Sequence, residues 1–130
     1  MVLDTSALVA VLLGEPESDR IIELLADPED PLISAATLFE TSIVMLAKTG
    51  AQGISDLDDL LMAGAVRCVA LDAAQAHLAR EAFERFGKGR ARAALNYGDC
   101  FAYALARSTA RPLLCKGDDF IHTDVELAMV

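Results

Sequence analysis

Met1-Val2-Leu3-Asp4-Thr5-Ser6-Ala7-Leu8 is the stretch that decides the class of fold. The apolar residues before Asp4 predict a short buried strand that ends there. The hydroxyl residues after it are suited to cap a helix running to about Leu13. A buried strand followed at once by a helix indicates an α/β unit. The stretch also places a carboxylate at the edge of a buried segment, which is costly unless the acid is paired, protonated or bound to a metal.

The same alternation continues along the chain. Further strands are predicted at 32–34, 66–70 and 113–115, and further helices at 18–26, 37–48, 55–63, 72–86 and 97–107. The sequence 27–31 predicts a turn, and the tail from Asp124 could add an edge strand. Short, continuously apolar strands between helices are typical of a mainly parallel sheet covered on both faces. We therefore expect a single domain over 1–130, an α/β sandwich.

Several helix starts follow from side-chain caps. Thr37 and Glu40 have the spacing of a capping box, and Ser55 with Asp58 indicates another capped start. Asn96 can cap the last predicted helix. In this interpretation Glu40 lies in the first turn of its helix.

Charge limits the possible functions. The net charge of −9 over 130 residues argues against a protein that coats nucleic acid by charge alone. It does not exclude a nuclease, because bound cations invert the local field. One basic segment interrupts the acidic chain: no acid occurs between Glu84 and Asp99, but four cations do, Arg85, Lys88, Arg90 and Arg92.

The cysteines and the apolar start indicate the compartment. Cys68, Cys100 and Cys115 are odd in number and widely spaced, which is typical of small buried side chains in a reducing compartment. The apolar segment 7–13 is too short to span a membrane, and Asp4 before it is unlike a signal peptide. We expect a cytoplasmic protein.

Carboxylates recur where buried segments begin or end. Asp4 ends the first strand, and Asp118 and Asp119 follow the last clear one. Ligands of parallel sheets collect at the carboxyl ends of the strands. Asp99 and Glu40 are expected in first turns of helices, where the helix dipole favours negative charge. We therefore expect these acids to converge at one sheet edge.

Each acid alone has a simpler explanation. Asp4 could cap the following helix, Glu40 could complete the capping box, and Asp99 could only face a helix dipole. Asp118 and Asp119 could form a solvated turn. Taken together they are harder to explain in this way, because the neighbouring cations are too few to pair them all.

Oxygen ligands of this kind favour Mg²⁺, with Mn²⁺ as a substitute, over Zn²⁺. The only histidines are His77, expected on an exposed helix face, and His122, just past the acidic turn. A Ser-His-Asp triad has no support in the sequence.

Four segments together resemble the PIN-domain ribonucleases, and specifically the VapC-type toxins of VapBC type II toxin–antitoxin systems. They are the opening 1–8, Ser34-Ala35-Ala36-Thr37-Leu38-Phe39-Glu40-Thr41, Leu95-Asn96-Tyr97-Gly98-Asp99-Cys100-Phe101-Ala102-Tyr103, and Leu113-Leu114-Cys115-Lys116-Gly117-Asp118-Asp119-Phe120. Each motif alone is weak, but the four occur in the family's order over nearly the whole chain.

The resemblance implies a PIN-like α/β/α sandwich and metal-dependent hydrolysis of RNA. Asp4 and Asp99 match the main metal ligands, and Glu40 matches the acid of the second motif. The last acid is assigned to Asp119, which precedes a Phe, with Asp118 in reserve. One or two metals could take part.

The resemblance also implies partners: a cognate VapB-type antitoxin and a second copy of the chain as a homodimer. Lys88, Arg90, Arg92 and Lys116 are candidate contacts to the RNA backbone, although a solvated loop explains each equally well. Two other functional classes fit parts of this pattern. An aspartyl phosphatase needs a second Asp where this chain has Ser6, and a non-catalytic PIN-like module would bind a cation and RNA or protein without cleavage.

Overall fold

A computed structural model describes residues 1–26 and 30–128. Four strands form one parallel sheet in the order β3-β2-β1-β4. They are β1 (Val2–Leu3), β2 (Leu32–Ser34), β3 (Arg67–Val69) and β4 (Leu113–Leu114). Val2 pairs with Leu32 on one side and with Leu113 on the other, so β1 is central. The predicted α/β fold with a parallel sheet is confirmed.

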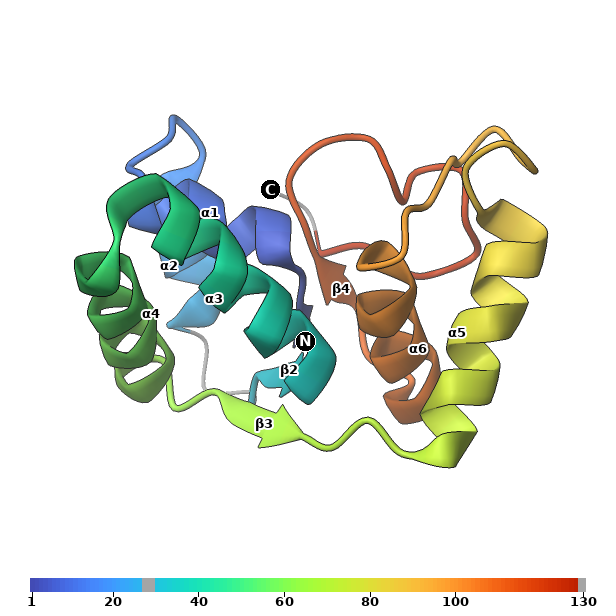
Figure 1. Cartoon of the computed structure of the whole chain (residues 1–130), viewed down its shortest axis with the longest axis horizontal. Coiled ribbons are helices and arrows are strands. Elements are labelled where there is room, and N and C mark those ends of the chain that lie inside the picture. Colours follow the sequence, from blue (N-terminus) through green and yellow to red (C-terminus); the bar gives the residue numbers. More distant parts are fainter. Residues whose placement is uncertain (27–29, 129–130) are drawn as a thin grey trace.

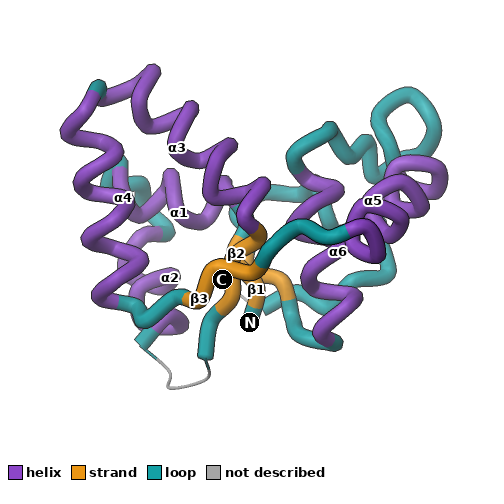
Figure 2. The backbone as a smooth tube through the Cα atoms, turned by 60° about the horizontal axis from the view of Figure 1, so that its bottom comes forward, coloured by secondary structure: helices purple, strands orange, loops and turns teal. Residues whose placement is uncertain are grey.

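Six helices cover the sheet (Figure 1). Their bounds are α1 Thr5–Leu12, α2 Ser18–Leu25, α3 Ala35–Thr49, α4 Ala51–Ala63, α5 Ala73–Phe86 and α6 Asp99–Thr109. Figure 2 shows the strands between two groups of helices, α1 to α4 on one side and α5 with α6 on the other.

The alternation of side chains along each strand builds two cores. Val2, Leu32 and Leu113 pack with residues of α5 and α6. Their neighbours Leu3 and Ile33 point to the other face and pack with residues of α1, α2 and α4. Because successive side chains of a strand point to opposite faces, a strand of two or three residues serves both cores. This explains why the strands are continuously apolar.

The start of α3 differs from the prediction. Ser34, at the end of β2, caps this helix by accepting a hydrogen bond from Ala36 N (3.3 Å). The capping box was wrong: Thr37 lies inside the helix, fully buried. The strand therefore leads directly into the helix, and Glu40 lies in the second turn instead of the first.

Helix α4 also begins earlier than predicted, at Ala51 instead of near Ser55. Gly50 ends α3 and precedes α4 with φ of 68°, a left-handed conformation that glycine adopts without steric cost. The chain can therefore reverse direction without a longer loop.

The strand β3 is less buried than its apolar sequence indicates. It lies at the sheet edge, and Cys68 is exposed, whereas Cys100 and Cys115 are buried as expected. At the opposite edge, Leu127 of the tail forms a single parallel bridge with Leu113 instead of a full strand. Most of the predicted turn at 27–31 lies outside the described residues. None of the helices in 1–26 and 30–128 has the length and apolar character to cross a bilayer.

Candidate active site

Asp4 lies at the carboxyl end of the central strand and is only 4% exposed. Its backbone N–H donates to Leu114 O (3.0 Å), which keeps it in line with β4. Its Oδ2 accepts from the backbone N–H (2.9 Å) and from the hydroxyl (2.6 Å) of Ser6. The predicted cap from the hydroxyl residues after Asp4 was wrong: Asp4 itself is the N-cap of α1, which was its simpler explanation.

Burial raises the pKa of Asp4 above its ordinary value, against the two hydrogen bonds from Ser6, and the nearby charge of Glu40 raises it further. The carboxylate is thus held in a place that disfavours its charge. A bound cation would relieve this cost.

Asp99 is the first residue of α6 and is 8% exposed. Its Oδ2 accepts from the backbone N–H of Asn96 (2.8 Å), and the side-chain oxygen of Asn96 accepts from the backbone N–H of Asp99 (2.9 Å). Asn96 thus makes the side-chain contact that the sequence predicted, although α6 begins at Asp99, two residues later than expected, with Gly98 as its N-cap. The reciprocal pair fixes the carboxylate at the helix start.

Burial raises the pKa of Asp99 to about 7, and the negative charges of Asp4, Asp119 and Glu40 raise it as well. The backbone bond from Asn96 acts in the opposite direction. Asp4, Glu40 and Asp119 therefore lie near enough to Asp99 for their charges to act on it. This is the convergence that the strand-end argument predicted.

Glu40 reaches this place from the second turn of α3. The Thr5 hydroxyl donates a short hydrogen bond to Glu40 Oε1. On its other side the carboxylate lies against Gly98, directly before Asp99. The expected reason for its position, a first helical turn, was wrong, because side-chain length and these two neighbours bring it to the sheet edge.

The loop after β4 carries Asp118 and Asp119, both exposed. The charge of Asp119 raises the pKa of Asp99. Burial raises the pKa of the Cys115 thiol to about 12, and the charges of Asp4, Asp119 and Asp99 raise it as well. Asp118 is not among the charges that act on either group. The electrostatics therefore favour Asp119 as the fourth acid.

Ser6 joins this loop to the first strand. Its hydroxyl donates to Asp4 and accepts from the backbone N–H of Lys116 (2.9 Å). Two strand ends are thereby tied through one side chain. The sequence prediction gave no such role to Thr5, Ser6 or Gly98. The only available hint was that hydroxyl residues follow Asp4 directly and a glycine precedes Asp99.

The acids do not form a closed cage. In the described part of the chain, no three His, Cys, Asp or Glu side chains are arranged closely enough to hold an ion by themselves. This fits the chemistry of Mg²⁺, which usually takes one or two carboxylates and keeps water or substrate phosphate as its other ligands. The donor set therefore suits Mg²⁺ bound by Asp4 and Asp99.

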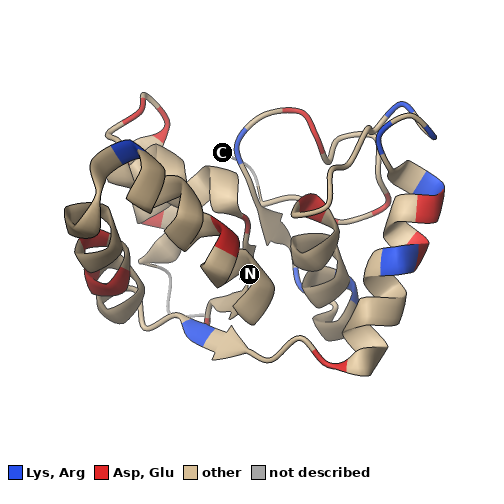
Figure 3. Cartoon of the chain, in the orientation of Figure 1, with Lys and Arg blue, Asp and Glu red and all other residues tan. Residues whose placement is uncertain are grey.

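The basic segment forms the loop between α5 and α6. Lys88, Arg90 and Arg92 are exposed, and none of them has an ion pair with a described acid. Figure 3 shows this basic end of α5 and the loop beyond it on the same side of the molecule as the start of α6.

The other basic candidate, Lys116, differs from these three. Its Nζ pairs with Glu15 and, at 3.3 Å, with Glu17. The positive charge of Lys116 is therefore already paired with two carboxylates. His77, predicted on an exposed helix face, contacts Arg80 within α5 (2.7 Å).

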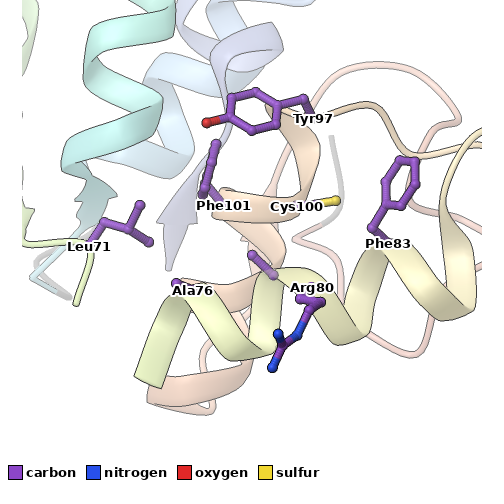
Figure 4. A pocket seen from close by; sticks show the side chains of 8 residues that line it. Leu71, Ala76, Arg80, Phe83, Tyr97, Cys100 and Phe101 are labelled. Atoms are coloured by element: carbon purple, nitrogen blue, oxygen red, sulfur yellow. The ribbon is translucent and has the colours of Figure 1, made fainter. Parts of the chain in front are cut away.

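A cavity of about 590 Å³ lies between α5 and the start of α6. Figure 4 shows Tyr97 and Phe101 on one wall and Phe83 on another, with Arg80 from α5 below. Its lining includes no carboxylate, so its chemistry is unsuited to a metal ion. The acidic cluster around Asp4, Glu40 and Asp99 is the better candidate for catalysis.

Three comparisons with known proteins agree with this geometry. The family model described as "PIN domain" matches residues 1–126. "Ribonuclease VapC" of Mycolicibacterium smegmatis is 50% identical over 125 residues, which cover 96% of this chain and 97% of that protein. The structure of Mycobacterium tuberculosis VapC20, described as a sarcin-ricin loop cleaving toxin, has a TM-score of 0.79 at 18% identity and covers 98% and 97% of the two chains.

A toxin–antitoxin complex from Klebsiella pneumoniae contains a chain with a TM-score of 0.70 at 20% identity, with coverage of 98% and 95%. At such low identities the solved structures establish the fold alone. Family membership rests on the match over 1–126 and on the 50% identical relative.

Proposed function

Because the chain belongs to the PIN-domain family and, within it, to the VapC ribonucleases, we propose that it is a Mg²⁺-dependent endoribonuclease, the toxin of a type II toxin–antitoxin pair. The observation that carries the proposal is the pair of buried acids Asp4 and Asp99. Both are held at one sheet edge with raised pKa values, and within residues 1–26 and 30–128 no Lys or Arg side chain forms an ion pair with either of them. A structural role alone would not favour such a costly arrangement.

Asp4 and Asp99 would hold the Mg²⁺ ion, with Glu40 and Asp119 completing the acidic pocket directly or through water. When bound, the ion would orient the scissile phosphate and lower the pKa of a water molecule. The protein contributes fixed positions: Ser6 holds Asp4, Asn96 holds Asp99, and Thr5 contacts Glu40. These bonds keep the carboxylates in place before substrate arrives.

RNA would approach along the loop after α5. Lys88, Arg90 and Arg92 are exposed and have no ion pair with a described acid, so they would contact phosphates, which position the strand without reading its sequence. Lys116 is a weaker candidate than the sequence indicated, because Glu15 and Glu17 already neutralise it.

The proposed protein partners are a VapB-type antitoxin and a second copy of the chain, with the cytoplasm as the place of action. An apolar strip on the surface of α3 supports a protein partner. Phe39, Ile43 and Leu46 are 68%, 52% and 55% exposed and follow one helical face. Light scattering of the chain alone and with its antitoxin would measure both assemblies. A chain that stays monomeric and does not bind the antitoxin would contradict both proposed partners.

The activity is tested with purified protein and a mixture of transfer, ribosomal and messenger RNA. We expect cleavage with Mg²⁺ or Mn²⁺, no cleavage with chelator, and no cleavage by Asp4→Asn in either ion. Sequencing of the new RNA ends would identify the substrate. A folded wild-type protein that cleaves none of these RNAs with either metal would favour the non-catalytic module instead.

A further inference from the structure

The Glu40 carboxylate is held from two sides by residues that are direct chain neighbours of the proposed metal ligands. Thr5 follows Asp4, and Gly98 precedes Asp99. Thr5 donates to Oε1, and Gly98 lies against Oε2. The acid from α3 is therefore positioned by the two segments that carry the other acids.

Gly98 has no conformational reason to be a glycine. Its φ of −66° and ψ of −40° are right-handed helical values that any residue adopts. A Cβ at this position would instead lie 1.6 Å from Glu40 Oε2, 2.4 Å from its Cδ and 2.8 Å from Oε1. The Glu40 carboxylate thus occupies the space that a side chain at position 98 would fill.

Thr5 supplies the opposite contact, and its own position is supported. Its Oγ1 lies 3.0 Å from the hydroxyl of Thr41, a fully buried residue one position after Glu40. The Thr41 hydroxyl is itself anchored by donating to Thr37 O (2.8 Å). A buried hydroxyl network of this kind limits the rotamers available to Thr5.

We propose that Thr5 and Gly98 form a carboxylate clamp that sets the position of Glu40 relative to Asp4 and Asp99, so that both are positioning residues for catalysis. The inference rests on the proposed function. In this proposal position 98 is a glycine because the Glu40 carboxylate needs the space, and not because the backbone conformation needs a glycine. It follows that a methyl group at position 98 moves the flexible end of Glu40 and leaves the fold intact.

The decisive experiment is a double-mutant cycle of Gly98→Ala and Glu40→Asp. Each single change misplaces the carboxylate, so each should lower kcat by about 100-fold, with KM within about 3-fold. The double variant should exceed the activity expected from independent effects by about 10-fold or more, because the shorter side chain withdraws from the new methyl group. Independent effects of the two changes would refute the clamp.

Thr5 is tested by a matched pair. Thr5→Val keeps the shape and loses the donor, whereas Thr5→Ser keeps the donor. We expect Thr5→Val to lower kcat by about 10-fold or more and Thr5→Ser to retain most of it. Equal losses in both variants would remove Thr5 from the clamp.

Gly64→Ala serves as the control glycine change. There the new methyl group would meet Val66 and Leu60 at 3.3 and 3.4 Å, far from any acid of the site. It should leave kcat unchanged, and thermal melts should show all variants folded.

A second readout separates this inference from the proposed function. The affinity for Mn²⁺, measured from the free-ion signal in electron paramagnetic resonance, should fall in each single variant and should fall no further in the double variant than in Glu40→Asp alone. If the wild-type protein binds Mn²⁺ but cleaves no RNA, the proposed function fails while the clamp is still measured. If cleavage occurs and the cycle shows no coupling in either readout, only the clamp fails.

Discussion

Replacing Asp99 by Asn removes one charge from the acidic cluster and keeps its main contact. The side-chain oxygen of asparagine can still accept the hydrogen bond that Asn96 N now donates to Asp99 Oδ2 (2.8 Å). The change therefore tests electrostatic cost with little change in shape. We expect Asp99→Asn to abolish cleavage and, in the absence of metal, to make the protein more stable at neutral and alkaline pH.

The magnitude follows from the pKa of Asp99, which burial raises from 3.8 to about 7 in the folded chain. One pH unit of pKa difference corresponds to about 1.4 kcal/mol, so the charged group costs at most about 4 kcal/mol. Screening by solvent at this open sheet edge reduces the expected gain to about 2 to 3 kcal/mol.

The sign depends on pH. Between pH 4 and 7 the folded chain retains the Asp99 proton and the unfolded chain has lost it, so wild-type stability falls as pH rises through this window. The variant lacks this dependence. The difference in unfolding free energy should be near zero at pH 4 and should reach its full value by about pH 8.

Urea unfolding with chelator at pH 4, 5, 6, 7 and 8 measures this difference. Asp58→Asn is the matched control, because it removes the same charge from an exposed position on α4 and should give no such trend. A difference that stays constant with pH, or a marked loss of stability in Asp99→Asn, would show that Asp99 is structural and would refute the electrostatic argument.

Three further predictions concern other parts of the molecule. Below about pH 7, the Kd for Mn²⁺ should rise by up to tenfold for each pH unit of acidification, because the ion must displace a proton from Asp99, whose pKa is about 7. Titration calorimetry at constant ionic strength measures this, and a Kd that does not change with pH would contradict it. Neutralising Arg90 and Arg92 together should lower the slope of log affinity against log salt by about 1.4 for single-stranded RNA, and an unchanged slope would remove the loop from the binding surface. Ser6→Ala should lower the unfolding free energy by about 1 to 3 kcal/mol, because Lys116 N loses its acceptor, and an unchanged urea midpoint would show that this tie is not needed.

Sequence patterns were sufficient to predict the parallel sheet because β1, β2 and β4 are buried on both faces. The start at Asp4 and the cap from Asn96 were also predictable, since both depend on neighbours within three residues. The start of α3 was not, because Ser34 and Thr37 are equally suitable caps, and only the end of β2 at Ser34 selects between them. The predicted burial of Cys68 was wrong because β3 lies at the edge of the sheet, and the order of strands in a sheet is decided only when the sheet assembles.

By itself, the sequence determined the type and the order of the acids that we propose as the site. A carboxylate buried at a strand end or a helix start is costly unless it is paired, protonated or bound to a metal, so the type and place of these acids along the chain point to a cation site. Tertiary structure alone decided how they meet. The Glu40 carboxylate lies beside the turn before Asp99 because Gly98 leaves room for it and Thr5 donates a hydrogen bond to it, and Lys116 pairs with Glu15 and Glu17. Such contacts join residues 35 to 101 positions apart. No local preference of the chain specifies them, because they depend on how the helices pack on the sheet.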